Sequence, residues 1–354
     1  MLQRPSVRSL LFAGASVSLG AVAALLVVEI GLRVLSVAPS AGISTVSEAE
    51  FARVPGLFSP GQRIVVRQVR ALPFAVQIDS LGYRGSDFPK GKTSGELRIL
   101  MVGDSFTFGD FVDDDETLPA QVERQLSARC ARPAIVINAG VGGSTITTAI
   151  QMVKRAWVTR PDIVVLTFSE NDVADLRSDN WHELAENRKA KSRFPLSVAY
   201  PVLRNLALWH FALDLRARWR VQARRSTGPD LFSNGPKGAV QALRAEYGRR
   251  FRDLAVEVRS KGRPLVLVAW PSHMTTRGAI GDDQLRWVEE IAKEESVPTI
   301  NLLRPFRASG LPVDSLYLLP RDGHASPRGN ELAGAQVAAN LVEGGFCDGQ
   351  KRIE

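Results

Sequence analysis

From Leu97 to the C-terminal region, short apolar runs alternate with longer amphipathic segments, and this alternation constrains the fold most strongly. An uninterrupted apolar run is typical of a parallel strand covered on both faces, and the amphipathic segments are typical of the covering helices. The expected strands are residues 98–102, 134–138, 163–168, 265–270 and 299–302. The expected helices are residues 117–129, 146–158, 238–260, 282–295 and 327–342. We therefore predict an α/β fold, a three-layer α/β/α sandwich with a five-stranded parallel sheet.

Residues 9–28 form an apolar segment without a charged side chain, and they follow Arg4 and Arg8. About 20 apolar residues are enough to span a bilayer as a helix. Because basic residues ahead of a span favour a cytoplasmic N-terminus, we expect a single-pass anchor in the inner (cytoplasmic) membrane. The domain that follows is then extracytoplasmic, on the periplasmic side. The alternative is a cleaved signal peptide, whose apolar core is usually only roughly 7–15 residues long.

The pattern divides the chain into regions. Residues 36–59 are rich in Ser, Ala, Gly and Pro without periodicity, which is typical of a linker. Short strand-like runs follow at residues 64–66 and 74–78. The expected regions are an N-terminal membrane anchor at 1–35, a linker at 36–62, an extension with short strands at 63–96 and a main domain at 97–346.

Residues 173–236 separate the third and fourth expected strands, and this gap is too long for an ordinary loop. Basic residues alternate there with apolar and aromatic ones, as in a basic amphipathic helical pair. Such an insertion would lie on a membrane or cap the active site. The alternative is a helix that packs on the domain with a solvated basic face.

The chain carries 45 basic and 37 acidic residues, a formal net charge of +8. Nucleic acid is not the expected partner, because no zinc-finger spacing, basic region with heptads or aromatic RNA-recognition motif is present. An anionic membrane surface or an acidic glycan fits this charge better. Cys130 and Cys347 are the only cysteines. In an oxidising compartment they could form a disulfide that closes most of the main domain, and two unrelated buried thiols are the alternative.

Four polar segments stand where ligands bind in such sheets, at the carboxyl ends of the strands and ahead of the last helix. They are Gly-Asp-Ser-Phe-Thr-Phe-Gly at 103–109, Asn-Ala-Gly-Val-Gly-Gly-Ser-Thr at 138–145, Ser-Glu-Asn-Asp at 169–172 and Asp-Gly-His at 322–324. In order and placement they resemble the four blocks of the SGNH or GDSL hydrolase superfamily, over residues 97–342. The resemblance implies a flavodoxin-like SGNH hydrolase fold and a serine nucleophile at Ser105.

A serine hydroxyl is a poor nucleophile and needs an imidazole to accept its proton. Of the four histidines, only His324 follows a carboxylate by two residues on a loop that enters a helix. Asp322 can then orient the imidazole, which completes a Ser-His-Asp triad. His273, after the fourth strand, is a second candidate for the base.

The tetrahedral intermediate carries negative charge on the former carbonyl oxygen, so fixed donors must face it. The expected donors are the backbone amide of Ser105, Gly143, which the resemblance implies, and the side-chain amide of Asn171. Gly140 and Gly142 are interpreted as permitting a tight turn. Asn171 could alternatively be a helix cap.

This chain departs from the usual family pattern at two places. One residue separates Asp322 from His324, where two are more usual, and Ser169-Glu170 replaces a typical Gly-Gly. The shorter spacing is similar to that of polysaccharide O-acetyltransferase relatives, which act outside the inner membrane. Residues 113–116 are acidic, but without a nearby histidine they are interpreted as a solvated helix N-terminus. We therefore expect no metal and no organic cofactor.

Together these residues predict a serine esterase that hydrolyses a carboxylic ester through an acyl-serine intermediate. The expected substrate is an O-acetyl or other short acyl group on a glycan, lipid, small molecule or envelope component. One alternative is an O-acyltransferase that passes the acyl group to a cell-envelope polysaccharide. Another is a catalytically idle glycan-binding or envelope scaffold protein.

Overall fold

The computed structural model describes residues 7–35, 42–67, 73–177, 180–225 and 237–347. Its centre is a five-stranded parallel sheet in the order β4-β3-β5-β6-β7. The strands are β3 (Leu97–Val102), β4 (Ala134–Asn138), β5 (Ile163–Ser169), β6 (Leu265–Trp270) and β7 (Thr299–Asn301). Every residue of β3, β5 and β6 is buried, as expected for strands covered on both faces. The predicted α/β sandwich with a five-stranded parallel sheet is confirmed.

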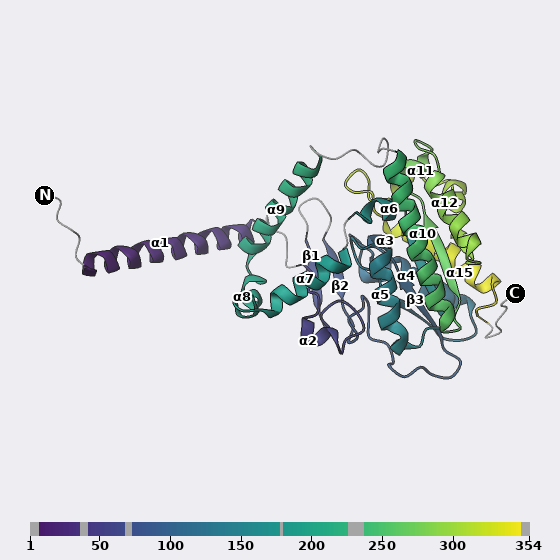
Figure 1. The fold of residues 1–354 in the computed structure, drawn as a ribbon, viewed down its shortest axis with the longest axis horizontal. Helices are drawn as coiled ribbons and strands as arrows, with labels where there is room; N and C mark the ends of the chain where they lie inside the picture. The colour runs from purple at the N-terminus through teal and green to yellow at the C-terminus, as the bar shows by residue number, and fades with distance from the viewer. Residues whose placement is uncertain (1–6, 36–41, 68–72, 178–179, 226–236, 348–354) are drawn as a thin grey trace.

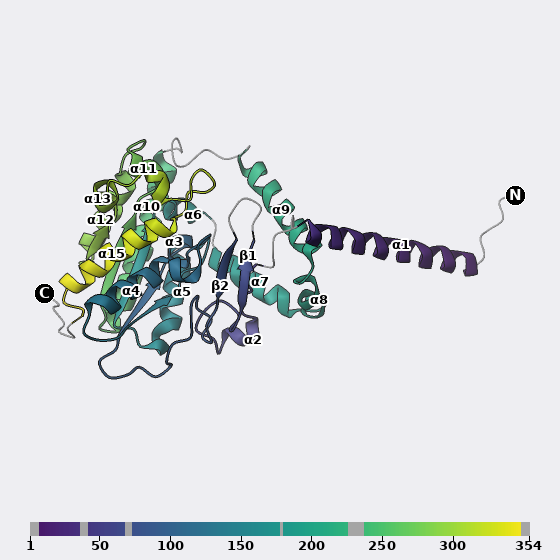
Figure 2. The ribbon, with the colours of Figure 1, turned by 180° about the vertical axis from the view of Figure 1, so that it is seen from behind.

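Helices cover both faces of the sheet (Figures 1 and 2). One face carries α5 (Ile146–Ala156), α10 (Lys237–Ser260) and α12 (Asp283–Glu294), which pack on alternate strand residues such as Leu100 and Val102. The opposite face carries α4 (Leu118–Arg129) and α15 (Pro327–Glu343), which pack on the intervening residues, such as Ile99 and Met101. Shorter helices complete the two layers. They are α3 (Ser105–Phe108), η1 (Asp114–Glu116), η2 (Trp157–Thr159), α11 (His273–Arg277), α13 (Leu303–Ala308) and α14 (Val313–Leu316).

The described part of the segment expected to be a linker is folded against the domain. Val46 and Leu57 are fully buried, and Ser47 forms a capping box at the start of α2 (Glu48–Phe51). The guanidinium of Arg155, on α5, donates to the carbonyl oxygens of Phe51, Val54 and Pro55. These buried contacts join the segment to the domain that follows. Next comes the expected pair of short strands, an antiparallel hairpin of β1 (Arg63–Val66) and β2 (Phe74–Gln77).

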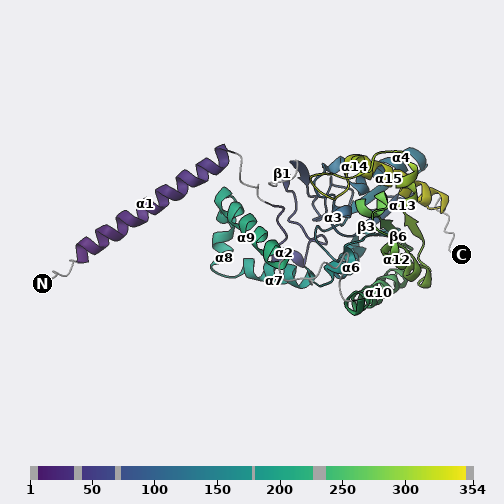
Figure 3. The same ribbon diagram turned by 90° about the horizontal axis from the view of Figure 1, so that it is seen from above.

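The insertion between β5 and β6 is helical where the structure describes it. Its helices are α6 (Asp172–Asp175), α7 (Asn180–Ser192), α8 (Leu196–Leu203) and α9 (Ala207–Arg225), and residues 226–236 lie outside the described residues. The α7 helix packs on the domain through Trp181, and its Arg188 lies over the rings of Phe51 and Trp181. By contrast, α8 and α9 lie beside the end of α1 (Val7–Val34) (Figures 1 and 3).

The apolar N-terminal segment forms most of α1, which projects from the domain (Figure 1). Its stretch Phe12–Val34 has a mean hydropathy of 2.1 and is 0% buried, so its length and composition suffice to cross a membrane. At the other end of the molecule, Cys130 and Cys347 form a disulfide that joins the end of α4 to the segment after α15. The expected alternative of two separate thiols is not what the structure shows.

Candidate active site

Ser105 is the first residue of α3 and follows the carboxyl end of β3. In the sheet, β3 lies between β4 and β5. The preceding residue, Asp104, is the N-cap of α3 and accepts a hydrogen bond from the Phe106 amide at 2.9 Å. This cap stabilises the sharp change from strand to helix. The change of direction carries Ser105 to the edge of the sheet, where its side chain is 7% exposed.

The structure brings Ser105, His324 and Asp322 into one hydrogen-bonded row. Nε2 of His324 lies 2.7 Å from Oγ of Ser105, although 219 residues separate them. On the other side of the ring, Nδ1 of His324 contacts Oδ1 of Asp322. The same carboxylate oxygen accepts the His324 backbone amide at 2.8 Å. The one-residue spacing is therefore sufficient, because the Asp322 carboxylate folds back onto both the ring and the amide of His324.

The electrostatics of this row follow from contact between the imidazole and the carboxylate. Burial lowers the pKa of His324, but the hydrogen bond and charge of Asp322 outweigh it and raise the pKa above its ordinary 6.5. Burial raises the pKa of Asp322, but the hydrogen bond and charge of His324 outweigh it, and the net shift is downward. Asp322 therefore stays ionised behind a ring that binds a proton more readily than a free histidine does.

Two of the three expected oxyanion donors are backbone amides, those of Ser105 itself and of Gly143. Among the residues that the structure describes, it records no acceptor for the amides of Ser105 and Gly143. Gly143 has a φ of 65°, a left-handed conformation that favours glycine. Gly140 has a different constraint, since a Cβ there would stand 2.2 Å from the backbone nitrogen of Phe108. Gly140 therefore permits the close approach of this loop to α3, and not merely a tight turn.

Asn171 lies at the carboxyl end of β5, but its side-chain amide donates to carboxylates. Nδ2 donates to Oδ2 of Asp175 at 2.8 Å, and Oδ2 of Asp104 lies 3.4 Å away. Asn171 is the N-cap residue of α6, the alternative role considered for it, but its side chain makes no cap hydrogen bond. Its role as the third oxyanion donor stays a prediction.

Comparison with known families decides where the chain belongs. Residues 101–332 match the model of the GDSL-like lipase/acylhydrolase family. The chain belongs to this family.

Solved structures of similar fold include several hydrolases, and no curated protein matches the chain. The lipase/acylhydrolase from Enterococcus faecalis is 18% identical, with a TM-score of 0.42, and the match covers 69% of this chain and 95% of that one. A catalytic mutant of an acetylxylan esterase from Geobacillus stearothermophilus is also 18% identical, with a TM-score of 0.39, and the match covers 72% and 96% of the two chains.

In this GDSL hydrolase, Ser169 replaces the first glycine of the usual third block and joins two carboxylates. Its Oγ lies 2.7 Å from Oδ2 of Asp104 and 2.9 Å from Oδ1 of Asp172. One hydroxyl proton cannot serve both oxygens. Burial, followed by the charge of Asp104, raises the pKa of Asp172 well above its ordinary value, which favours a protonated carboxyl that can donate the second hydrogen bond. Ser169 thereby fixes Asp104, the cap of the helix that carries Ser105.

Glu170, the second departure from the family pattern, ties β5 to α11. Its carboxylate accepts the amide of Ser272 at 2.6 Å and the hydroxyl of Thr275 at 2.7 Å. These contacts hold the start of α11, where His273 lies. Oγ of Ser105 contacts the ring of His324 and not that of His273. A Cβ on Gly323 would stand 3.3 Å from Nδ1 of His273, so this second candidate lies close to the turn between Asp322 and His324.

Arg84, in the N-terminal extension, organises the loop that follows α3, a role that no sequence pattern predicts. Its buried guanidinium donates to the carbonyl oxygens of Phe108, Gly109 and Val112 at 2.6 to 2.9 Å. It also donates to Oδ1 of Asp114 at 2.8 Å. Backbone acceptors have no sequence signature, so only the structure reveals this contact set.

The acidic run at 113–116 takes part in the same junction. Oδ1 of Asp113 accepts the amide of Ala75 at 2.6 Å, and Oδ2 of Asp114 accepts the amide of Gln77 at 2.7 Å. The run stands at the start of η1, as expected, with Asp113 exposed as its N-cap, and in addition these two carboxylates bind the edge of β2. Within the described ranges, no group of three or more His, Cys, Asp or Glu could hold a metal ion.

The loop that Arg84 holds carries Phe111 to the imidazole. The Phe111 ring lies 5.2 Å from the His324 ring, and Phe106 packs at the same distance from a different angle. Phe111 has a φ of 70°, a strained conformation for a bulky residue that the surrounding contacts must maintain. Beside it, a cleft of about 390 Å³ opens along Asp322 and is also lined by Tyr317 and Leu318.

We expect that Arg84→Met lowers the free energy of unfolding by about 3–5 kcal/mol, because it leaves the Asp114 carboxylate and several carbonyls without their donor. The ester-hydrolysis rate should fall as well, since the loop that places Phe111 loses its support. Urea unfolding of the full chain in detergent, together with kcat, measures both effects. The matched control is Arg63→Met, an exposed arginine on β1, which should change stability by less than about 0.5 kcal/mol. Equal stability of the two variants would contradict the role given to Arg84.

Proposed function

We propose that this GDSL hydrolase is a serine esterase that cleaves a short acyl ester on a glycan or other component of the cell envelope. The observation that carries the proposal is the 2.7 Å contact between Oγ of Ser105 and Nε2 of His324, with Asp322 bound to the far side of the ring. This is the arrangement of nucleophile, base and orienting carboxylate that acyl transfer to serine requires.

In the first half of the proposed reaction, Oγ of Ser105 attacks the ester carbonyl while Nε2 of His324 takes its proton. Asp322 stabilises the imidazolium. The oxyanion accepts hydrogen bonds from the amides of Ser105 and Gly143 and from the side chain of Asn171. Collapse of the tetrahedral intermediate breaks the ester C–O bond. The alcohol leaves with the proton from His324, and the acyl group stays on Ser105.

In the second half, water attacks the acyl-serine and His324 again serves as base, then returns the proton to Oγ of Ser105. The surroundings of the imidazole support a short acyl group. Phe106 and Phe111 both pack on His324, and Ser105 itself is buried among residues of the domain. These two rings flank the imidazole, so we expect acetyl and propionyl esters to react faster than octanoyl esters.

The proposed location is the periplasmic face of the inner membrane, with α1 as a single span. Two features support it. The length and hydropathy of α1 suit a bilayer, and Arg8 precedes the apolar stretch, which favours a cytoplasmic N-terminus. The disulfide between Cys130 and Cys347 is of a kind that forms and persists in oxidising compartments.

We expect the rate of ester hydrolysis to fall at low pH with an apparent pKa above 6.5. Only neutral His324 can accept the serine proton, and the contact with Asp322 raises its pKa above that ordinary value. The rate should therefore be highest above this pKa and decline as the imidazole becomes protonated. Measuring kcat/KM of the full chain in detergent with 4-nitrophenyl acetate, across neutral and acidic pH, gives the profile. An acid limb with an apparent pKa below 6.5, or no acid limb, would contradict His324 as the base.

The same preparation tests the substrate proposal. With an acetylated oligosaccharide, an esterase releases free acetate. A transferase, given a donor ester and an unacetylated oligosaccharide, would instead form acetylated sugar in excess of free acetate. If no ester is hydrolysed and no acyl group is transferred, the result would support the alternative of a catalytically idle binding protein.

A further inference from the structure

The end of α1 is bonded to the insertion between β5 and β6. Both oxygens of the Glu29 carboxylate accept backbone amides at the start of α9, from Ala207 and Leu208, at 2.9 Å each. Arg33 pairs with Glu29 at 2.6 Å and also donates to the carbonyl oxygen of Asn205 at 2.6 Å. A carboxylate suits a helix N-terminus, where amide protons lack partners. The start of α9 is therefore attached to the last two turns of the apolar helix.

Next to this attachment, α8 exposes a row of large apolar side chains. Val198 and Val202 stand four residues apart on one side of α8, and Phe194 lies just ahead of the helix. Their exposures are 84%, 68% and 64%. We call these three residues the α8 surface. No residue of α8 is buried, so among the residues that the structure describes nothing covers the apolar side of this helix.

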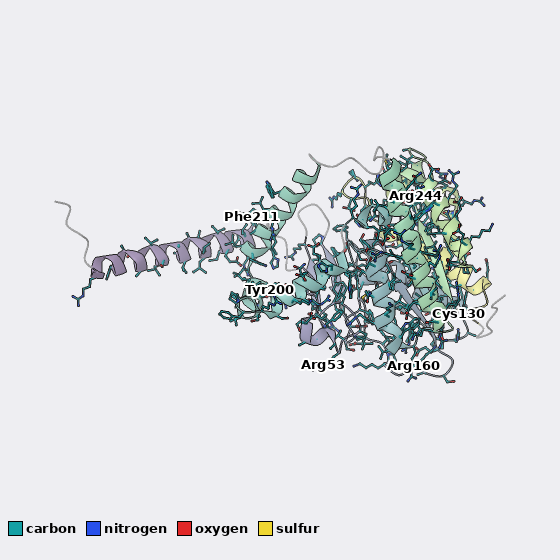
Figure 4. All side chains as sticks on the ribbon, viewed as in Figure 1. Arg53, Cys130, Arg160, Tyr200, Phe211 and Arg244 are labelled. Carbon is teal, nitrogen blue, oxygen red and sulfur yellow. A yellow bond between two sulfur atoms is a disulfide. The ribbon has the colours of Figure 1, made fainter. Side chains whose placement is uncertain are left out.

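Aromatic and basic side chains accompany the α8 surface. Lys191 lies 4.8 Å from the ring of Tyr200, and Lys189 and Arg193 are exposed just ahead of the helix. Figure 4 labels Tyr200 on this insertion and Phe211 close to the end of α1. Apolar side chains next to aromatic rings and cations are typical of a helix in the layer between lipid headgroups and acyl chains.

The position of the α8 surface selects lipid over other occupants. The start of α9 contacts the end of α1, and Figures 1 and 3, seen from perpendicular directions, both show α8 on the side of the domain from which α1 projects. The exposed apolar stretch Phe12–Val34 ends there. If α1 crosses a bilayer, the bilayer boundary falls at this junction, and the α8 surface continues the apolar surface of the span. A patch in that place meets acyl chains before it meets a soluble partner.

We propose that α8 and the start of α9 lie in the interfacial layer of a phospholipid bilayer and form a second membrane attachment beside α1. The proposal rests on the proposed span of α1. It places the catalytic domain close against the bilayer instead of on a free tether. Lys189 and Arg193 would face the headgroups, and anionic lipids would strengthen the contact.

Spin labels on single introduced cysteines test this directly. The full chain, with its native disulfide intact, is reconstituted into vesicles of phosphatidylcholine and phosphatidylglycerol. Labels are attached in separate variants at Val198→Cys and Val202→Cys. The matched control is Val158→Cys, because Val158 is 67% exposed and lies next to Arg160, which Figure 4 shows away from α1. A label at Val22→Cys, within α1, reports the span itself. Unchanged ester hydrolysis shows that each variant is folded.

Collision with oxygen, which concentrates in lipid, is compared with collision with a water-soluble nickel chelate. We expect the oxygen-to-nickel ratio at positions 198 and 202 to exceed that at position 158 by about fivefold or more. A ratio equal to that at position 158 would overturn the proposal. Protection from both reagents would also overturn it, because a protein partner or second copy would then cover the surface. The label at position 22 separates two failures: if it is in lipid, only the α8 attachment fails, and if it is in water, the span fails as well.

Discussion

The Ser105→Ala variant is expected to lose about 10⁴-fold or more in kcat/KM towards 4-nitrophenyl acetate. Without Oγ no acyl-serine can form, and only the oxyanion donors and substrate binding remain. The loss should appear mainly in kcat, because Ser105 takes part in the chemical step and contributes little to substrate binding. Steady-state kinetics of the full chain in detergent measure it.

The matched control for this variant is Ser127→Ala, an exposed serine on α4, which should keep the wild-type rate. The Ser105→Ala protein should also unfold at nearly the wild-type temperature, because its Oγ makes a single contact with His324. Equal rates for Ser105→Ala and the wild type would show that Ser105 is not the nucleophile.

The second large effect is expected for Asp322→Asn, with a fall of about 10³- to 10⁴-fold in kcat. The amide is nearly the same shape as the carboxylate and can still accept the His324 backbone amide. It cannot stabilise an imidazolium, and it favours the wrong tautomer of the ring. Because Asp322 raises the pKa of His324, the residual activity should also show its acid limb at lower pH than the wild type.

Asp314→Asn provides the comparison for Asp322→Asn. Asp314 lines the same cleft, is well exposed and pairs with Arg277 without contacting His324. Its neutralisation should leave both the rate and the pH profile unchanged. If Asp322→Asn retained the wild-type rate, His324 would need a different orienting group.

The central sheet could be predicted because its signal is local and redundant. A buried parallel strand must be apolar along its whole length, and the predicted bounds match the observed strands at Ala134–Asn138 and Leu265–Trp270. The contact of Ser105 with His324 could also be predicted from the sequence. Parallel strands bring their carboxyl ends to one edge of the sheet, so polar residues at those ends meet despite their separation in the chain.

Other parts of the site depend on contacts that leave no pattern in the sequence. Arg84 binds mainly carbonyl oxygens, which every residue possesses, so nothing in the sequence around residues 108–112 marks them as its partners. In the sequence Ser169 is only a departure from the family pattern, whereas in the fold its hydroxyl lies between two carboxylates. The buried Val46 and Leu57 lie among Ser, Gly and Pro residues whose lack of periodicity resembles a linker. In each case the determining partner is distant in the chain.

The central claim, that Ser105 is the nucleophile activated by His324, is tested most directly by covalent labelling. A fluorophosphonate probe reacts with a serine only when a base activates it. The full chain is treated with the probe, digested, and the adduct located by mass spectrometry. We predict one adduct, on Ser105, formed in parallel with the loss of ester hydrolysis and absent from His324→Gln. An adduct on another serine, or complete inhibition with Ser105 unmodified, would contradict the account.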